Sequence, residues 1–216
     1  MSIKDALVYY KTECLPAELI AVSKRKPESD IQLAYDAGQR HFGENYIQEL
    51  VSKAEQLPKD IYWHFIGHLQ SNKVKYIAAF VHLIHAVDSI KLLVEINKQA
   101  EKNNRQIAVL LQIHIAQEDS KFGIPETELE SFSQQILSLN LSHIIIKGLM
   151  TMASNTDDLE QVNLEFSKVK KLSQKLQQSF PEAKEISMGM SGDYKLALSN
   201  GRTMVRIGSA IFGERA

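Results

Sequence analysis

The chain alternates short apolar runs with longer amphipathic segments, and this alternation restricts its fold more than any other feature. Eight runs have the length of buried strands: residues 19–23, 41–42, 62–66, 83–87, 107–115, 144–149, 185–188 and 203–207. Seven segments are predicted helices: residues 29–37, 46–57, 71–80, 89–103, 125–139, 156–180 and 192–199. Their apolar residues recur at three- and four-residue steps, most clearly in 156–180. Strands that alternate with helices predict a parallel sheet covered by helices, an α/β fold.

Two architectures fit this order, an open doubly wound sheet and a closed (β/α)8 TIM barrel. The count of eight strands favours the barrel, for which 216 residues is near the lower end of the usual range. No Pro/Gly/Ser-rich linker divides the chain, so residues 1–216 are expected to form one domain. In a barrel the last strand lies beside the first, and the loops after the strands form the active face.

The balance of charges excludes several classes of partner. The chain has 25 Lys and Arg against 26 Asp and Glu, which gives no case for nucleic acid or anionic membranes. The longest apolar stretch, residues 107–116, is too short to span a bilayer. Cys14 cannot form an internal disulfide, and the N-terminal residues lack a signal-peptide pattern. These features predict a cytoplasmic protein.

Lys24 stands where the first apolar run reaches its loop, an unusual position for a lysine. Burial disfavours the ammonium form, and a neutral amine can condense with a carbonyl group. A surface lysine at a strand end is the plain alternative. Lys26 precedes Pro27 and belongs to the loop, whereas Lys147 also lies in an apolar run and is the stronger rival. Position alone favours Lys24 over Lys147.

Arg206 is a second cation on a predicted strand, and it shares its side of that strand with Met204 and Gly208. If that side faces the barrel interior, the guanidinium needs a partner. A structural carboxylate and the ring nitrogen of a pyridine are both candidates, and the residues alone favour the carboxylate.

The loops after the last two strands contain candidate phosphate sites. Ser191 or Gly192 lies near a predicted helix start, where backbone N–H groups attract anions, and Gly208 and Ser209 offer the same chemistry. Asp193 would repel a phosphate and is assigned to the helix start instead. If the two ends of the chain meet, Lys24 and these loops form a site for a phosphorylated aldehyde.

The histidines predict no metal site. His64 and His68 are four residues apart but lie on a strand, and His82 and His85 have no cysteine or carboxylate at metal-ligand spacing. Hydrogen-bonded or core histidines are therefore expected. Asn45 either contacts a ligand or caps the helix that follows it.

Six motifs in order, spanning residues 21–213, resemble the pyridoxal phosphate homeostasis protein family, which is similar to the N-terminal barrel of alanine racemase. They are Ala21-Val-Ser-Lys24-x-Lys-Pro27, His41-Phe-Gly-Glu-Asn45, His64-Phe-Ile-Gly-x-Leu-Gln70-x-Asn-Lys73, Gly148-Leu-Met-Thr-Met152, Ser187-Met-Gly-Met-Ser191-x-Asp193 and Val205-Arg-Ile-Gly-Ser-Ala-Ile-Phe-Gly213. The chain departs from the family pattern at Ser209, where threonine is common, and at His114, where asparagine is common.

The resemblance implies a role for each site residue. Lys24 would form a Schiff base with pyridoxal 5'-phosphate, and Arg206 would face the pyridine nitrogen. The phosphate would be held by Ser187, Gly208 and Ser209, and the ring would lie near Asn45 and Met190.

The resemblance also implies a function in cofactor supply. An arginine beside the ring nitrogen disfavours its protonation, which makes the cofactor a weaker electron sink. Alanine racemase adds a second domain with a tyrosine base, whereas here the barrel uses the whole chain. The implied function is non-catalytic: the protein stores or buffers pyridoxal phosphate, or delivers it to dependent apoenzymes, with effects on amino-acid and keto-acid pools.

Family members are often monomeric, which predicts a monomer here. Two alternatives remain. One is a small single-domain amino-acid racemase, and the other is a barrel that binds a different phosphorylated metabolite without a covalent bond.

Overall fold

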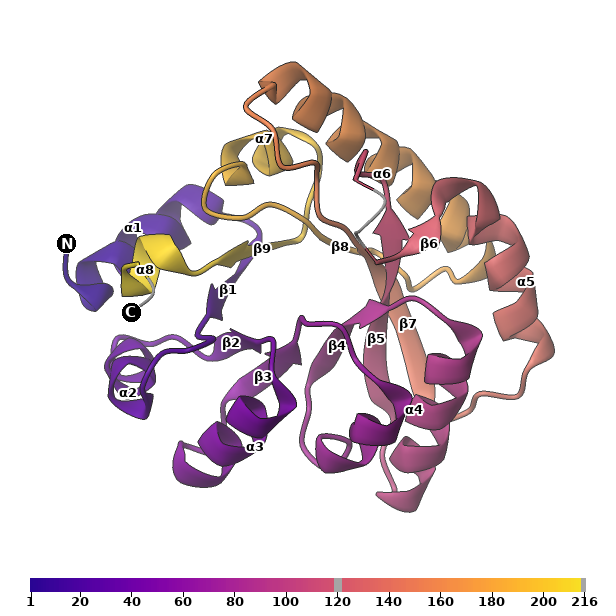
Figure 1. Cartoon of the computed structure of the whole chain (residues 1–216), viewed down its shortest axis with the longest axis horizontal. Coiled ribbons are helices and arrows are strands. Elements are labelled where there is room, and N and C mark those ends of the chain that lie inside the picture. The colour runs from indigo at the N-terminus through magenta and orange to yellow at the C-terminus, as the bar shows by residue number, and fades with distance from the viewer. Residues whose placement is uncertain (119–121, 215–216) are drawn as a thin grey trace.

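The computed structural model describes residues 1–118 and 122–214, in which parallel strands close into a barrel surrounded by helices (Figure 1). The barrel strands are β1 (Glu18–Val22), β2 (His41–Glu44), β3 (Tyr62–Phe65), β4 (Leu83–Val87), β5 (Ile107–His114), β7 (Ile144–Met150), β8 (Glu185–Ser187) and β9 (Met204–Ile207). Each pairs with its neighbours in this order, and β9 pairs with β1 to close the ring. The predicted (β/α)8 barrel is confirmed, and the open sheet is excluded.

The closing seam joins the two ends of the chain. Leu19 of β1 is in register with Val205 of β9, and Ile20 is in register with Arg206. On its other edge β1 pairs with β2 through Ala21 and Phe42. This register places the ends of β1 and β9 side by side, as their adjacency in a barrel predicts.

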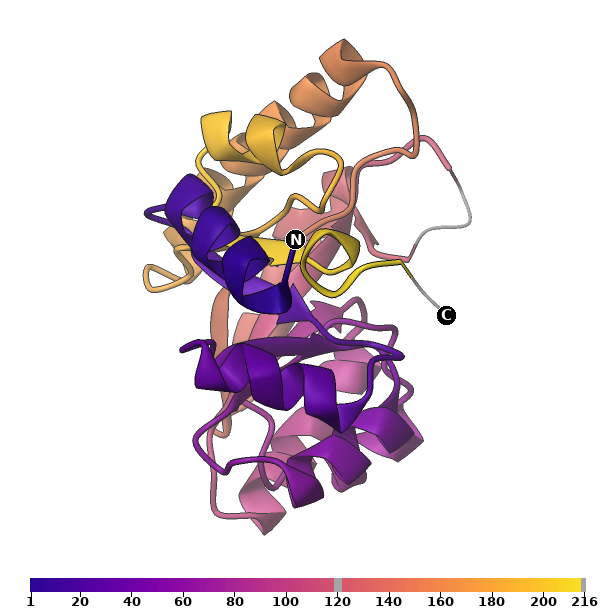
Figure 2. The ribbon, with the colours of Figure 1, turned by 90° about the vertical axis from the view of Figure 1, so that its left-hand side faces the viewer.

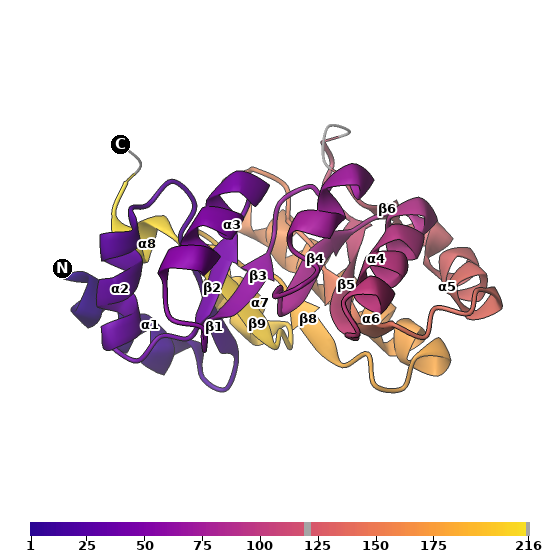
Figure 3. The same cartoon turned by 90° about the horizontal axis from the view of Figure 1, so that it is seen from below.

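Helices cover the outside of the barrel, and several of them lie on the face shown in Figure 3. They are α1 (Ile3–Cys14), α2 (Glu28–Asp36), α3 (Ile47–Gln56), α4 (Ile90–Lys102), α5 (Leu129–Ser138), α6 (Leu159–Ser179), α7 (Tyr194–Ser199) and α8 (Ser209–Phe212). The 3₁₀ helices are η1 (Ser71–Tyr76) and η2 (Glu126–Glu128). Helices α1 and α8 pack together beside the closing seam (Figure 2).

Several elements differ from the sequence prediction. Helices α1 and α8 were not predicted, and the expected helix 71–80 is the shorter 3₁₀ helix η1. Pro125, expected in the first turn of a helix, lies instead in the two-residue strand β6 (Ile124–Pro125), which pairs with β5. A proline at such an edge is tolerated because no ladder hydrogen bond requires its missing N–H.

Residues of alternate parity along the strands face opposite sides of the barrel wall. Leu19, Phe42 and Trp63 are buried in the large core shared with the helices. Gly43 faces the interior, because a Cβ atom there would lie 3.1 Å from side-chain atoms of both Ile20 and Ile66. Within the described ranges, no helix combines the length and apolar character needed to cross a membrane.

Candidate functional site

A cleft opens where the barrel strands end, and it contains most of the residues singled out in the sequence. Its volume of about 250 Å³ suits one small substituted ring better than a dinucleotide. Six predicted cofactor residues line it: Lys24, Asn45, Met190, Arg206, Gly208 and Ser209. The rest of the lining is Val22, Lys26, Ile66, Met152, Ser191, Gly192 and Gly213. Closure of the barrel therefore brings both ends of the chain into one cleft.

Arg206 is a buried cation in this cleft, with only 4% of its surface exposed. Its Nη1 donates to Ser187 Oγ at 2.6 Å, and its Nη2 donates to the carbonyl oxygen of Thr151 at 2.8 Å. Burial lowers the pKa of Arg206 to about 10, with the charge of Asp193 acting in the opposite direction. The guanidinium is still protonated at neutral pH, so it presents hydrogen-bond donors to a ligand.

Ser187 is the one predicted site residue outside the cleft lining. It is fully buried, and its hydroxyl accepts from Arg206. On its other side, Ser187 Oγ lies 3.0 Å from His85 Nδ1. The hydrogen-bonded chain continues from His85 to His64 over 2.8 Å and from His64 to His41 over 2.9 Å. These contacts join Ser187 to Arg206 on one side and to the histidines on the other.

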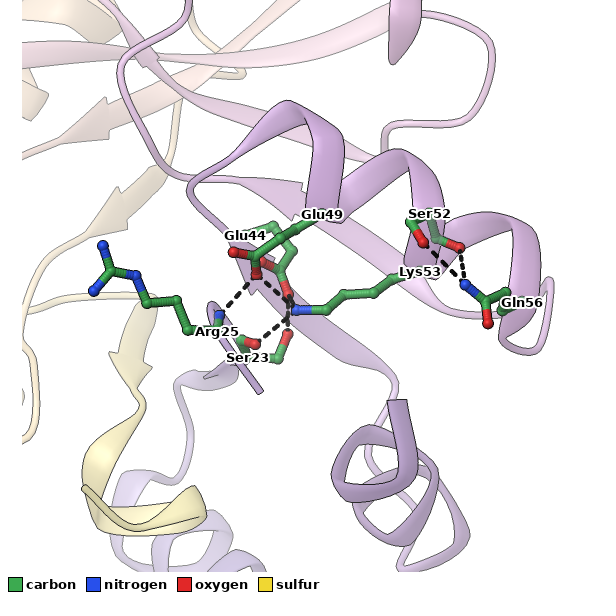
Figure 4. Close-up of polar contacts among 7 residues, drawn as sticks. All are labelled: Ser23, Arg25, Glu44, Glu49, Ser52, Lys53 and Gln56. Carbon is green, nitrogen blue, oxygen red and sulfur yellow. Dashed lines mark hydrogen bonds and ion pairs between the residues drawn. The ribbon is translucent and has the colours of Figure 1, made fainter. Parts of the chain in front are cut away.

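Lys24 lies in the turn that follows β1, and a buried polar network fixes the residues on both sides of it (Figure 4). Ser23 Oγ donates to Glu44 Oε1 at 2.6 Å, and the backbone N–H of Arg25 donates to Glu49 Oε2 at 2.7 Å. Arg25 has a φ of 58°, a left-handed conformation that these contacts must support. The network thus sets the direction of the Lys24 turn.

Lys53 of α3 is the centre of this network. Its ammonium group lies 2.8 Å from Glu44 Oε1 and 3.0 Å from Glu49 Oε2, and it donates to the Ser23 carbonyl at 2.9 Å. Burial raises the pKa of Glu44, although Lys53 and Ser23 oppose the shift. Burial also acts to raise the pKa of Glu49. The hydrogen bond from the Arg25 N–H and the contact with Lys53 together have the larger effect, so the pKa of Glu49 is lowered.

Asn45 follows β2 at the cleft, and its side-chain oxygen Oδ1 is buried without a hydrogen-bond partner. A buried acceptor without a partner costs free energy, on the order of 1–3 kcal/mol. A donor on a bound molecule would remove that cost. This orphan oxygen is therefore an observation in favour of a polar ligand in the cleft.

The loops after β8 and β9 meet at the edge of the cleft. Ser209 Oγ lies 3.4 Å from Ser191 Oγ, and both hydroxyls border the same space. Asp193 turns back on its own loop, where its carboxylate accepts from the backbone N–H of Met190. Ser191 and Ser209, together with Gly192 and Gly208, form a polar wall of small residues whose backbone is accessible to a ligand.

The geometry distinguishes Lys24 from its rival Lys147, and it shows what surrounds His64 and His68. Lys147 lies within β7 and is not among the cleft residues, whereas Lys24 and Lys26 are. His68 stacks on Phe122 with 4.0 Å between ring centroids, whereas the buried His64 is hydrogen-bonded to His41 and His85. The apolar walls from Ile66 and Met152 were not predicted, because isolated apolar residues at strand ends look like ordinary core.

The family model described as alanine racemase, N-terminal domain, matches residues 3–216. The pyridoxal phosphate homeostasis protein of Vibrio alginolyticus is 44% identical over 203 residues, covering 92% of this chain and 86% of the relative. That of Pasteurella multocida is 41% identical over 219 residues, covering 99% and 93%. The chain belongs to the pyridoxal phosphate homeostasis protein family. The family resemblance of the six motifs is thereby confirmed.

Solved structures agree with this family assignment. The PipY protein of Synechococcus elongatus, solved with PLP bound, has a TM-score of 0.89 and 35% identity, covering 98% of this chain and 100% of PipY. The alanine racemase of Bartonella henselae has a TM-score of 0.75 but 19% identity, with 60% of its chain covered. That second likeness shows the shared barrel fold alone.

Proposed function

We propose that this chain binds pyridoxal 5'-phosphate and acts in the homeostasis of that cofactor, as its homeostasis relatives are named to do. The observation that carries the proposal is the meeting of Lys24 and Arg206 in one cleft with the serine pair at its edge. A reactive aldehyde, a pyridine ring and a phosphate need an amine, a donor near the ring nitrogen and an anion site. The cleft offers all three.

The residues present fit this cofactor. Lys24 is the proposed covalent anchor for the aldehyde, Asn45 and Met190 would lie near the ring, and the unpartnered oxygen of Asn45 would receive a donor. Arg206 would point a protonated guanidinium at the ring nitrogen and so keep that nitrogen unprotonated. When bound, pyridoxal phosphate supplies an electrophilic aldehyde and a modest electron sink.

The best-supported phosphate site is the wall that the loops after β8 and β9 form at the edge of the cleft. Gly208 and Ser209 remain the proposed contacts, and Ser191 with Gly192 joins them from the opposite loop. We reassign Ser187 from the phosphate to Arg206, because its hydroxyl already accepts from the guanidinium.

The proposed role is storage, buffering or delivery of the cofactor to pyridoxal phosphate-dependent apoenzymes, with effects on amino-acid and keto-acid pools. We propose that residues 1–216 act as a single domain and as a monomer, without robust catalytic turnover. The buried free thiol of Cys14 supports a reducing, cytoplasmic setting. A mass measurement by light scattering should give about one chain of 24.4 kDa.

Titration of the untagged chain with pyridoxal phosphate tests this proposal. We expect a new visible absorbance band that Lys24→Ala abolishes and that the matched cleft variant Lys26→Ala retains. An alanine racemisation assay on the same sample separates the alternatives, since turnover near that of dedicated racemases would refute the homeostasis role. A protein that binds phosphate esters but stays colourless would instead support binding of another metabolite.

A further inference from the structure

Three histidines converge at the end of the barrel opposite the cleft. His41 is the first residue of β2, His82 immediately precedes β4, and His64 lies inside β3. Their rings are 5.2 to 5.8 Å apart between centroids. One nitrogen from each ring can be chosen so that all three lie within 4.8 Å of one another. In the described part of the chain, this is the one group of three potential metal ligands so arranged.

We propose that His41, His64 and His82 bind a divalent transition-metal ion of the zinc class at the amino-terminal mouth of the barrel. Three imidazoles are a known ligand set for zinc, with Zn–N distances near 2.0–2.1 Å and a fourth position left for water. Such distances place the ligand nitrogens about 3.4 Å apart in tetrahedral geometry. The 2.9 Å between His41 Nδ1 and His64 Nε2 would widen to this spacing, and the exposed ring of His82 would move inward to complete the set.

The surroundings favour neutral imidazoles, the form that binds metal. Burial lowers the pKa of His41 and His82, and it lowers that of His64 well below the ordinary range. The cation Lys11 lies near His41, and Arg105 lies near His82; both favour the neutral rings but oppose a bound cation. The Glu18 carboxylate, 3.7 Å from His41 Nε2, offsets part of this positive charge.

Groups behind the proposed ligands hold them in place. His64 Nδ1 lies 2.8 Å from His85 Nε2, and His85 is held in turn by Ser187. A second hydrogen-bonded partner of this kind fixes the ring orientation of a metal-binding histidine. Tyr62 packs against His41 and His82, with 4.7 Å between its ring centroid and that of each histidine. Metal binding would exchange the 2.9 Å hydrogen bond between His41 and His64 for two metal–nitrogen bonds.

Calorimetric titration of the full-length, untagged chain with Zn²⁺, and with Co²⁺ followed by its visible absorbance, tests the site. We expect one equivalent to bind, with affinity reduced at least about tenfold in His82→Ala and in His41→Gln. His68→Gln is the matched control, because His68 lies with Asp88 and Phe122 away from the group. Circular dichroism confirms that each variant is folded.

Two results would overturn the proposal. One is the absence of saturable Zn²⁺ and Co²⁺ binding by the parent chain. The other is binding that His82→Ala and His41→Gln leave unchanged, or that His68→Gln weakens equally. Because His82 and His41 lie at the opposite mouth from Lys24, failure here would leave the pyridoxal phosphate titration unaffected.

Discussion

Arg206 shows how one side chain can be charged and still lie inside a barrel. Its guanidinium donates to two neutral oxygens, Ser187 Oγ and the Thr151 carbonyl, which replace part of its lost hydration. Ser187 in turn contacts His85, so the arginine is anchored to a polar column within the barrel. The position of the guanidinium therefore depends on a serine that does not itself reach the cleft.

Ser187→Ala should destabilise the fold by roughly 1–3 kcal/mol, because a buried N–H of Arg206 loses its acceptor. Urea denaturation measures the change. Ser133→Ala is the control, since Ser133 is also buried but its hydroxyl donates to the Leu129 carbonyl of its own helix and accepts from no cation among the described residues. Equal losses in the two variants would show that Ser187 does not support the arginine.

Cys14 should be unreactive in the folded protein. Its side chain is fully buried, and burial raises the pKa of the thiol to about 11. At pH 8 a rise of about two units reduces the thiolate fraction about 100-fold, before access is considered. A disulfide reagent should therefore label Cys14 only after denaturation, and rapid labelling of the native chain would contradict this burial.

At the scale of elements, β1, β2 and α3 are joined by the network of Ser23, Glu44, Glu49 and Lys53. The network connects one helix to the ends of two strands, and the Lys24 turn lies between its hydrogen bonds. It stabilises the junction of β1, β2 and α3, and the position of Lys24, the proposed anchor, depends on that junction. Removal of the central cation should therefore affect both stability and cofactor binding.

Lys53→Met should cost about 3–5 kcal/mol, because it leaves the buried Glu44 without its cation. Folding raises the pKa of Glu44, so the carboxylate form is disfavoured and stability is lost as pH rises through the folded-state pKa. The deficit of the variant should thus shrink at acidic pH, where Glu44 takes up a proton. Urea denaturation at several pH values measures this loss of stability, with Lys98→Met, at an exposed position, as the control. A loss that does not change with pH would contradict the role given to Glu44.

The elements also show what the sequence could and could not predict. Strands were predictable because buried parallel strands are apolar runs bounded by turns. The 3₁₀ form of η1 was not, because α- and 3₁₀-helices both bring every third residue to one face. Helix α1 was missed because its buried residues, Ala6, Leu7 and Cys14, form a weak pattern. The Lys53 network joins three elements, and no spacing along the chain reveals such contacts.

At the scale of the whole molecule, closure of the barrel makes the site. The β1–β9 pairing brings Lys24 and Arg206, 182 residues apart in sequence, into one cleft. Parity along the strand put Arg206 on one side with Gly208 but left open whether that side faces inward, whereas strand counting predicted that β1 and β9 are neighbours. The three histidines at the opposite mouth were not foreseen, because they come from β2, from β3 and from the residue before β4, and share no metal-ligand spacing.

Reduction of the pyridoxal phosphate complex with borohydride, followed by peptide mapping, tests the central claim most directly. Reduction makes the bond between cofactor and lysine permanent, so the modified residue can be located. We predict a single pyridoxyl adduct on Lys24. An adduct on Lys147 or Lys26, or the absence of any adduct, would contradict the claim that closure of the barrel makes Lys24 the anchor.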